Sequence, residues 1–276
     1  MRIRILCLSA AIFFGISLGA SRAGSLRIIS LGPALTESVF TLGVSDQLVG
    51  VTTYCTKPVQ AQEKDKVGAA VEFNVEKVLT LNPTLVLATS LSDPKSVAKL
   101  QSLGINVEVF PAARSFNQLC EEFLRLAALI GEQEKAETIL TKVRAEVEDI
   151  RGKTSVLPKP SVVVQAGANP LWVVPQDYFI NDFIEYAGGE NIIPAGNGHF
   201  SREKILGLNP DVIIITTMGI VGDEEKQKWE QYRSINAVKN RRIYIVDSDK
   251  FCSPTPEGFV ETLKETVKLL HPEYEE

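Results

Sequence analysis

Aromatic side chains gather in loops that follow aliphatic, strand-like segments of this chain. Tyr54 follows segment 48–51, and Trp172 and Tyr178 follow segment 161–165. Rings on two such loops can hold a large, flat, partly apolar ligand, although packing within its own domain explains each single ring equally well. The pattern predicts ligand contacts by Tyr54, Trp172 and Tyr178.

Four other side chains near these loops add candidate ligand contacts. Lys57 could meet a carboxylate or phosphate of the ligand, and a solvated lysine is the equal alternative. Phe73, His199 and Phe200 stand just before two predicted helices. His199 could ligate a metal carried by the ligand, although a lone histidine in a loop is more often solvated.

Motifs for catalysis are missing from the chain after residue 23. That part contains no GxxxxGK[ST] or GxGxxG phosphate loop and no GxSxG nucleophile elbow. No nucleophile, base and orienting group come together, and two histidines without a CxxC motif do not predict a zinc site. The sequence predicts a binding protein that is not an enzyme and has no cofactor or metal of its own.

Residues 1–23 read as a signal peptide. Two arginines precede an apolar run over residues 5–18, and small residues at Ser21 and Ala23 suit a cleavage site. The run is shorter than the roughly 20 residues that a membrane span needs, and an uncleaved anchor is the alternative. We therefore expect an exported, periplasmic protein that begins near Gly24.

The charge of the chain limits its partners. Loss of the three arginines within residues 1–23 moves the formal net charge from −5 to −8. A mildly acidic surface argues against nucleic acid and against anionic lipid as the main partner. The rest of the chain is long enough for two small domains.

Three cysteines remain after residue 23, so at least one is unpaired in a monomer. Cys120 falls on a helical pattern, where a buried thiol is expected. Cys55 and Cys252 lie in predicted loops, which makes them the candidate disulfide pair.

A long amphipathic helix is predicted over residues 132–151, between Gly131 and Gly152. Its apolar residues from Ala136 to Ile150 lie mostly three or four positions apart and form one stripe. Such a helix would be about 30 Å long. The pattern allows an ordinary surface helix or a strut between two lobes.

The two halves of the chain repeat each other. Segment 75–89 (VEKVLTLNPTLVLAT) matches segment 202–216 (REKILGLNPDVIIIT), and similar elements flank both. Helix, Asn-Pro stop and strand are common punctuation in α/β proteins, but this alternative does not explain the whole matching order. The repeat therefore predicts two copies of one α/β lobe.

The repeat sets the fold class. Aliphatic strands that alternate with helices predict two Rossmann-like lobes with mainly parallel sheets, over residues 24–130 and 154–276. Residues 131–153 supply the one long α-helix that joins them. A ligand cleft is expected between the lobes, outside the carboxyl ends of the strands.

Glu76 and Glu203 occupy equivalent positions in the repeat, at the starts of equivalent helices. A glutamate in the first turn is favoured by the helix dipole, by about 0.3–1 kcal/mol. A symmetric acidic pair on two lobes would also match basic pockets on a two-fold symmetric partner. The two explanations are compatible.

Five segments carry a resemblance to a known family, in order over nearly the whole mature chain: RIISLGPALTESVFTLG, LVGVTTYC, NVEKVLTLNPTLVLAT, GGENI and SREKILGLNPDVIIIT. They resemble the helical-backbone class of substrate-binding proteins of ABC importers, nearest to the periplasmic cobalamin-binding proteins. Haem- and ferric-siderophore-binding proteins are relatives. The resemblance implies a monomer with ligand held between two lobes. It also implies that Glu76 and Glu203 dock on the permease dimer in the inner membrane.

The resemblance extends to the site but departs from it in places. Tyr54 matches a ligand-contacting tyrosine of the cobalamin binders, and Trp172 falls on an aromatic position. Two tryptophans that flank cobalamin are replaced at about Ala70 and Asn197, and the cysteine beside the GGEN motif is Ala187.

The tyrosine of haem binders is also absent near residues 68–71. A corrinoid is the first expectation for the cargo, and haem or a ferric siderophore is the second. A secreted α/β enzyme with its active site in the cleft, and a sensor subunit of the same fold, are the alternatives from other classes.

Overall fold

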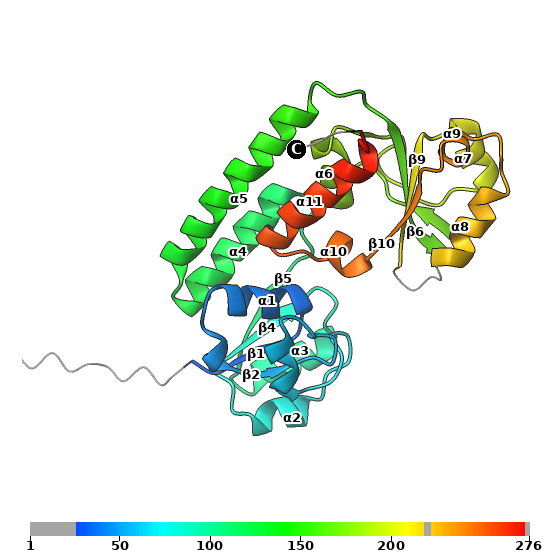
Figure 1. Ribbon diagram of the computed structural model, residues 1–276. Coiled ribbons are helices and arrows are strands. Elements are labelled where there is room, and N and C mark those ends of the chain that lie inside the picture. Colours follow the sequence, from blue (N-terminus) through cyan, green and yellow to red (C-terminus); the bar gives the residue numbers. More distant parts are fainter. Residues whose placement is uncertain (1–25, 218–221, 274–276) are drawn as a thin grey trace, which may run out of the picture.

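The computed structural model describes residues 26–217 and 222–273 (Figure 1). The predicted signal peptide, residues 1–23, lies outside the described residues. Within the described ranges, no helix is both long and apolar enough to cross a membrane.

The N-terminal lobe is built on one parallel sheet. Its strands lie side by side in the order β3-β2-β1-β4-β5, and every pair is parallel. The strands are β1 (Ile28–Ser30), β2 (Leu48–Val51), β3 (Asp65–Lys66), β4 (Leu85–Thr89) and β5 (Asn106–Phe110). Connecting helices are α1 (Pro33–Thr41), α2 (Val75–Thr80) and α3 (Pro94–Ser102), with short 3₁₀ turns at Ser45–Gln47 and Val59–Glu63.

Side chains of the central strands are buried on both faces of this sheet, as aliphatic runs in a parallel sheet require. Local signals set the helix ends. Pro33 opens α1, and the side chain of Asn74 caps α2 by accepting the N–H of Lys77.

The C-terminal lobe has a mixed sheet in the order β10-β9-β6-β7, with β8 also paired to β6. The strands are β6 (Ser161–Ala168), β7 (Leu171–Val173), β8 (Glu190–Asn191), β9 (Val212–Thr216) and β10 (Ile243–Val246). All pairs are parallel except β6 with β7, which form an antiparallel hairpin. The helices are α6 (Ile180–Tyr186), α7 (Arg202–Leu208), α8 (Gly222–Glu230), α9 (Asn236–Lys239), α10 (Ser248–Cys252) and α11 (Pro256–Leu270).

The long helix α5 (Gln133–Thr154) joins the lobes and continues past Gly152, where the sequence predicted its end. Gly152 is helical because nothing there requires a left-handed backbone, whereas Gly131 ends helix α4 (Phe116–Ile130) at φ +80°. The predicted fold class, two α/β lobes with mainly parallel sheets and a joining helix, is confirmed.

Helix α5 is not the sole packing link between the lobes. Figure 1 shows α4, α5 and α11 side by side, and α11 contacts both of the others. Phe116 of α4 packs on Phe259 of α11 with ring centroids 4.5 Å apart. The backbone N–H of Phe116 also donates to Asp182 Oδ2 of α6 at 2.7 Å. The lobes are therefore joined by a layer of three helices with a continuous buried core.

Candidate ligand-binding site

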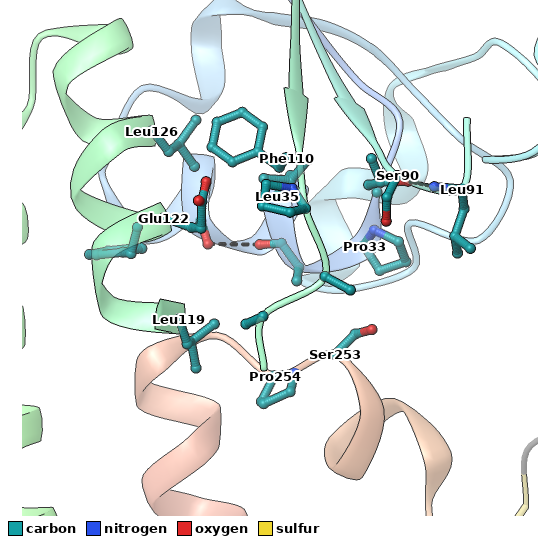
Figure 2. Close-up of a pocket in the computed structure, with 18 of the residues that line it drawn as sticks. Pro33, Leu35, Ser90, Leu91, Phe110, Leu119, Glu122, Leu126, Ser253 and Pro254 are labelled. Carbon is teal, nitrogen blue, oxygen red and sulfur yellow. Dashed lines mark hydrogen bonds between the residues drawn. The ribbon is translucent and has the colours of Figure 1, made fainter. Parts of the chain in front are cut away.

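A pocket of about 210 Å³ lies between the N-terminal lobe and the connection from α10 to α11 (Figure 2). The N-terminal lobe contributes residues 31–35 after β1, residues 89–91 after β4, residues 110–113 after β5, and one face of α4. Ser253 and Pro254 line the opposite wall. The carboxyl ends of neighbouring parallel strands converge here, which is where ligands bind in α/β sheets.

The pocket is lined mainly by apolar side chains. Among its described lining residues none is lysine, arginine or histidine, and the ionisable ones are Glu122 and Cys252. Burial, with a further contribution from Asp249 and Asp247, raises the pKa of the Cys252 thiol to about 11. The thiol is therefore neutral at pH 7. Glu122 supplies the one carboxyl group among the described lining residues.

An aromatic cluster lies at the hairpin of the C-terminal lobe. Trp172 of β7 packs edge-to-face against Tyr178, with ring centroids 5.2 Å apart, and pairs through its backbone with His199. Tyr178 and His199 are exposed. A Cβ at Gly198 would lie 2.6 Å from Trp172 Nε1, so glycine lets this segment approach the indole. The structure thus brings together Trp172, Tyr178 and His199.

Phe200 is turned toward its own lobe. Its half-buried ring packs against the core of that lobe, and Lys204 Nζ lies 4.1 Å from the ring centroid. Phe73 is buried in the core of the N-terminal lobe. Its side chain is 5% exposed and packs with Val67 and Val78, so Phe73 is a core residue and the predicted ligand contact there is wrong.

Tyr54 and Lys57 lie in the loop after β2. Tyr54 is 65% exposed and Lys57 is also exposed. Burial raises the pKa of Glu37 on α1, Lys57 opposes this shift, and Asp249 and Glu261 of the other lobe add to it. Lys57 therefore lies on the side where α1 faces α10 and α11.

The predicted disulfide between Cys55 and Cys252 is wrong, because both thiols are free, as is that of Cys120. Cys55 is buried in the core and its sulfur lies 3.1 Å from Thr52 Oγ1, whereas Cys252 lines the pocket between the lobes. Cys120 is buried, as predicted, and burial raises its pKa although Arg144 opposes the shift.

Glu76 and Glu203 are exposed in the first turns of α2 and α7. Hydrogen bonds from the Glu203 backbone and from the Ser201 side chain lower the pKa of Glu203. Ser201 caps α7 by accepting the N–H of Lys204, as Asn74 caps α2. The repeat therefore places both glutamates in the first turn of a helix with a capping side chain.

The C-terminal lobe contains a buried polar network that the sequence did not predict. The side chain of Glu225 is 2% exposed, pairs with Arg202 and Lys228, and accepts the amide of Gln165 at 2.7 Å. The indole N–H of Trp229 donates to Gln165 Oε1 at 2.6 Å. Burial alone would raise the pKa of Glu225, but hydrogen bonds from Lys228, Gln165 and Arg202 together lower it.

The only sequence signal for this network is the polar Gln165 at the end of an aliphatic run in a buried strand. No group of three or more metal-binding side chains occurs among the residues that the structure describes. The geometry offers an apolar pocket, an aromatic cluster and two exposed glutamates, and a concave apolar pocket suits binding of a ligand.

Comparison with known proteins defines the class. The sequence pattern of the periplasmic binding protein family matches residues 28–250. The chain is 31% identical over 258 residues to the uncharacterized ABC transporter substrate-binding lipoprotein YvrC of Bacillus subtilis, covering 90% of this chain and 80% of that protein. It is 26% identical over 234 residues to the vitamin B12-binding protein of Vibrio cholerae, covering 83% and 84%.

A solved structure of a possible iron-binding (periplasmic solute-binding) protein from Staphylococcus epidermidis has the same fold. Its TM-score is 0.80 at 27% identity, and the match covers 89% of this chain and 98% of that one. The chain therefore belongs to the periplasmic binding protein family. It is a substrate-binding protein of the ABC-transporter type, and membership of this family implies an exported protein.

Proposed function

We propose that this protein captures a bulky metal chelate, a corrinoid such as cobalamin, and delivers it to an ABC permease dimer in the inner membrane. The main support for this proposal is the pocket between the lobes. Its described lining is mainly apolar and contains no cationic side chain. A corrinoid carries neutral amides around a flat ring, which such a lining accepts. The vitamin B12-binding relative of Vibrio cholerae supports the same choice.

A haem or ferric-siderophore cargo is the second candidate. The exposed His199 and Tyr178 beside Trp172 favour it, since imidazole and phenolate groups bind iron. The carboxylates of haem would need a cation, and Lys57 is the exposed lysine on the side where the lobes face each other.

Four of the proposed contacts have exposed side chains, and Trp172 is half-buried beside Tyr178. Tyr54 and Lys57 would contact the ligand from the N-terminal lobe, and Trp172, Tyr178 and His199 from the other. The proposed organisation is a signal peptide (1–23), two lobes (24–130 and 154–276) and the joining helix (131–153). In this proposal the chain acts as a periplasmic monomer without a catalytic step. Because three packed helices connect the lobes, we expect ligand binding to move them only slightly.

Calorimetric titration of the mature protein with cyanocobalamin, haemin and a panel of ferric siderophores tests the cargo. We expect cyanocobalamin to bind at micromolar concentration or below. Haemin binding alone would replace the corrinoid with the second candidate. Absence of binding to every chelate would reject the proposed function, and turnover of a small-molecule substrate would favour the enzyme alternative.

A further inference from the structure

We infer that Arg202 is a positioning residue that makes the hairpin of β6 and β7 and the first turn of α7 move as one unit, so that a ligand on Trp172 also sets the position of Glu203. This inference rests on the proposed function, in which Trp172 contacts the ligand and Glu203 docks on the permease. Its starting point is a closed ring of contacts that joins Trp172 to Arg202 by two routes, one through the main chain and one through side chains.

The main-chain route runs through the segment directly before α7. Residues 198–200 pair with β7 through two backbone hydrogen bonds, with N···O distances of 2.8 and 3.4 Å. Trp172 lies opposite His199 in this pairing. The next residue along the chain, Ser201, caps α7 and precedes Arg202. By itself this link can absorb a shift of Trp172, because the backbone before α7 can rotate about its φ and ψ angles.

The side-chain route runs through Gln165, a polar residue of β6 that is fully buried. Its amide nitrogen donates to the backbone oxygen of Gly167 at 3.1 Å and to Glu225 Oε2 at 2.7 Å. The same oxygen of Glu225 is ion-paired with Arg202. Gly167 lies opposite Trp172 in the hairpin. The hairpin is therefore joined to the start of α7 a second time, and this second link closes the ring.

The side-chain route is held firmly by Trp229 of α8, which packs on the same face of the sheet as α7 (Figure 1). The indole N–H of this buried residue donates to Gln165 Oε1 at 2.6 Å, so both ends of the amide have partners. The Arg202 guanidinium lies over the same indole, 4.6 Å from the ring centroid. These groups move together, because separating them would leave buried polar atoms without partners.

Stability alone does not explain an arginine at position 202. The equivalent residue of the N-terminal lobe is Val75, and α2 begins there with the same kind of cap. A buried ion pair is often no more stable than apolar packing of the same volume. Arg202 Nη1 is also buried without a hydrogen-bond partner among the described residues, which costs free energy. What arginine adds over valine is the connection to Glu225 and the hairpin.

Hydrogen exchange measured by mass spectrometry tests the coupling, since amide exchange reports local opening of each element. The probes are cyanocobalamin and haemin, and calorimetry shows which of them binds. In the native protein we expect a bound probe to slow exchange in the hairpin, residues 165–173, and also in α7, residues 204–208. The slowing in α7 should be about three- to thirtyfold, within the range of coupling between groups in contact.

The double variant Arg202→Leu and Glu225→Leu removes the side-chain route and leaves neither charge buried without its partner. A bound probe should still slow exchange in its hairpin, but exchange in its α7 should stay within about twofold of the probe-free rate. Lys228→Met is the matched control, because it also removes a cation paired with Glu225 but one that is exposed and outside the ring. It should keep the native response in α7. Urea unfolding checks that each variant is folded.

Trp172→Ala tests the ring without a ligand. Loss of the indole should loosen the hairpin and speed exchange in α7 of the otherwise native protein by about three- to tenfold. The same substitution in the double variant should leave exchange in α7 unchanged, because the ring is already open there.

A response of α7 that survives in the double variant overturns this inference alone, as does a native α7 that ignores a bound probe. Loss of the hairpin response together with that of α7 also overturns it, because Arg202 would then act on ligand contact itself. If neither probe binds, the corrinoid and haem cargoes of the proposed function are rejected, and Trp172→Ala decides the inference. An equal effect on α7 with and without the side-chain route then overturns it.

Discussion

The two lobes have equivalent helix ends and outer faces at α2 and α7, but the residues packed behind these helices differ. Helices α2 and α7 each begin with a capping side chain, carry an exposed glutamate in the first turn, and end before an asparagine with positive φ, 46° at Asn82 and 49° at Asn209. Asparagine is one of the few residues that tolerate this left-handed conformation. The features that the repeat preserves are thus those that fix the ends and outer faces of the two helices.

The interiors behind these helices differ. In the N-terminal lobe Val75 precedes Glu76 and packs against an apolar core. In the other lobe Arg202 precedes Glu203 and is bound to the buried Glu225 and stacked 4.6 Å from the Trp229 ring centroid. The comparison teaches that both helices have a side-chain cap and a buried apolar residue, Val78 in α2 and Ile205 in α7, and that α7 is held in addition by a buried ion pair.

Charge reversal at the docking positions should have the largest effect. The double variant Glu76→Lys and Glu203→Lys should abolish transport, because both proposed contacts with basic pockets of the permease become repulsive. Uptake of labelled ligand and calorimetry on the purified variant measure this, and ligand affinity should be unchanged. If the lobes dock symmetrically, the two single reversals should impair uptake equally.

Reversal of two exposed glutamates on α5, Glu134→Lys and Glu137→Lys, is the control. It introduces the same charge change away from α2 and α7 and should leave uptake intact. Normal uptake by the Glu76 and Glu203 double variant would reject the docking proposal.

Removal of the buried carboxylate should have the next largest effect. Glu225→Ala leaves Arg202 without its buried partner, which should lower the free energy of unfolding by about 3–5 kcal/mol. Urea unfolding measures the change. Val75→Ala, at the position of the other lobe that corresponds to Arg202, should lower it by less than about 1.5 kcal/mol because Val75 is only partly buried.

Replacement of both Arg202 and Glu225 by leucine should recover most of the stability lost in Glu225→Ala, since no buried charge then lacks a partner. A loss in Glu225→Ala no larger than that in Val75→Ala would contradict the contrast between the two lobes.

The helix caps should have smaller and unequal effects. Asn74→Ala should lower the free energy of unfolding by about 1 kcal/mol, within the usual range for a lost N-cap. Ser201→Ala should lower it by about half as much, because Arg202 also holds the start of α7. Denaturant titration and amide hydrogen exchange of α2 and α7 compare them. Equal losses would show that the Arg202 contact does not brace the helix.

The pH dependence of stability should show the smallest effect, with opposite signs at two carboxyls. Burial raises the pKa of Asp182 above 3.8, so this group stabilises the fold at low pH, and its contribution is lost as pH rises from about 4 through the raised pKa. The lowered pKa of Glu225 has the reverse consequence, because that stabilisation is lost as pH falls.

Asp182→Asn keeps an oxygen that can accept the Phe116 N–H and removes the buried charge. Its stability relative to the native protein should therefore increase from about pH 4 toward neutrality. Thermal unfolding across this range checks the trend, and a constant difference would contradict it.

Much of the fold could be predicted because it depends on local patterns. The apolar stripe from Ala136 to Ile150 predicted α5, and the Asn-Pro stops at 82–83 and 209–210 predicted the two equivalent helices. Cys120 and its burial followed from the same helical periodicity. These signals involve residues only a few positions apart, so the sequence displays them directly.

The site could be predicted only in part. Trp172, Tyr178 and His199 lie together, but Trp172 belongs to a hairpin of β6 with β7 where the sequence predicted a loop. The predicted ligand contact at Phe73 and the predicted disulfide between Cys55 and Cys252 were wrong. Local spacing along the chain does not reveal which side chains are buried or which distant segments meet.

The sequence by itself determined the duplicated α/β lobes, the helix between them and the matched positions of Glu76 and Glu203. Periodicity, capping residues and a repeat carry that information within short stretches of chain. Only the tertiary structure decided that α11 completes the helical layer beside α4 and that Glu225 is a buried anchor. Each of these depends on residues far apart in sequence that exclude water from one another, which no single segment can specify.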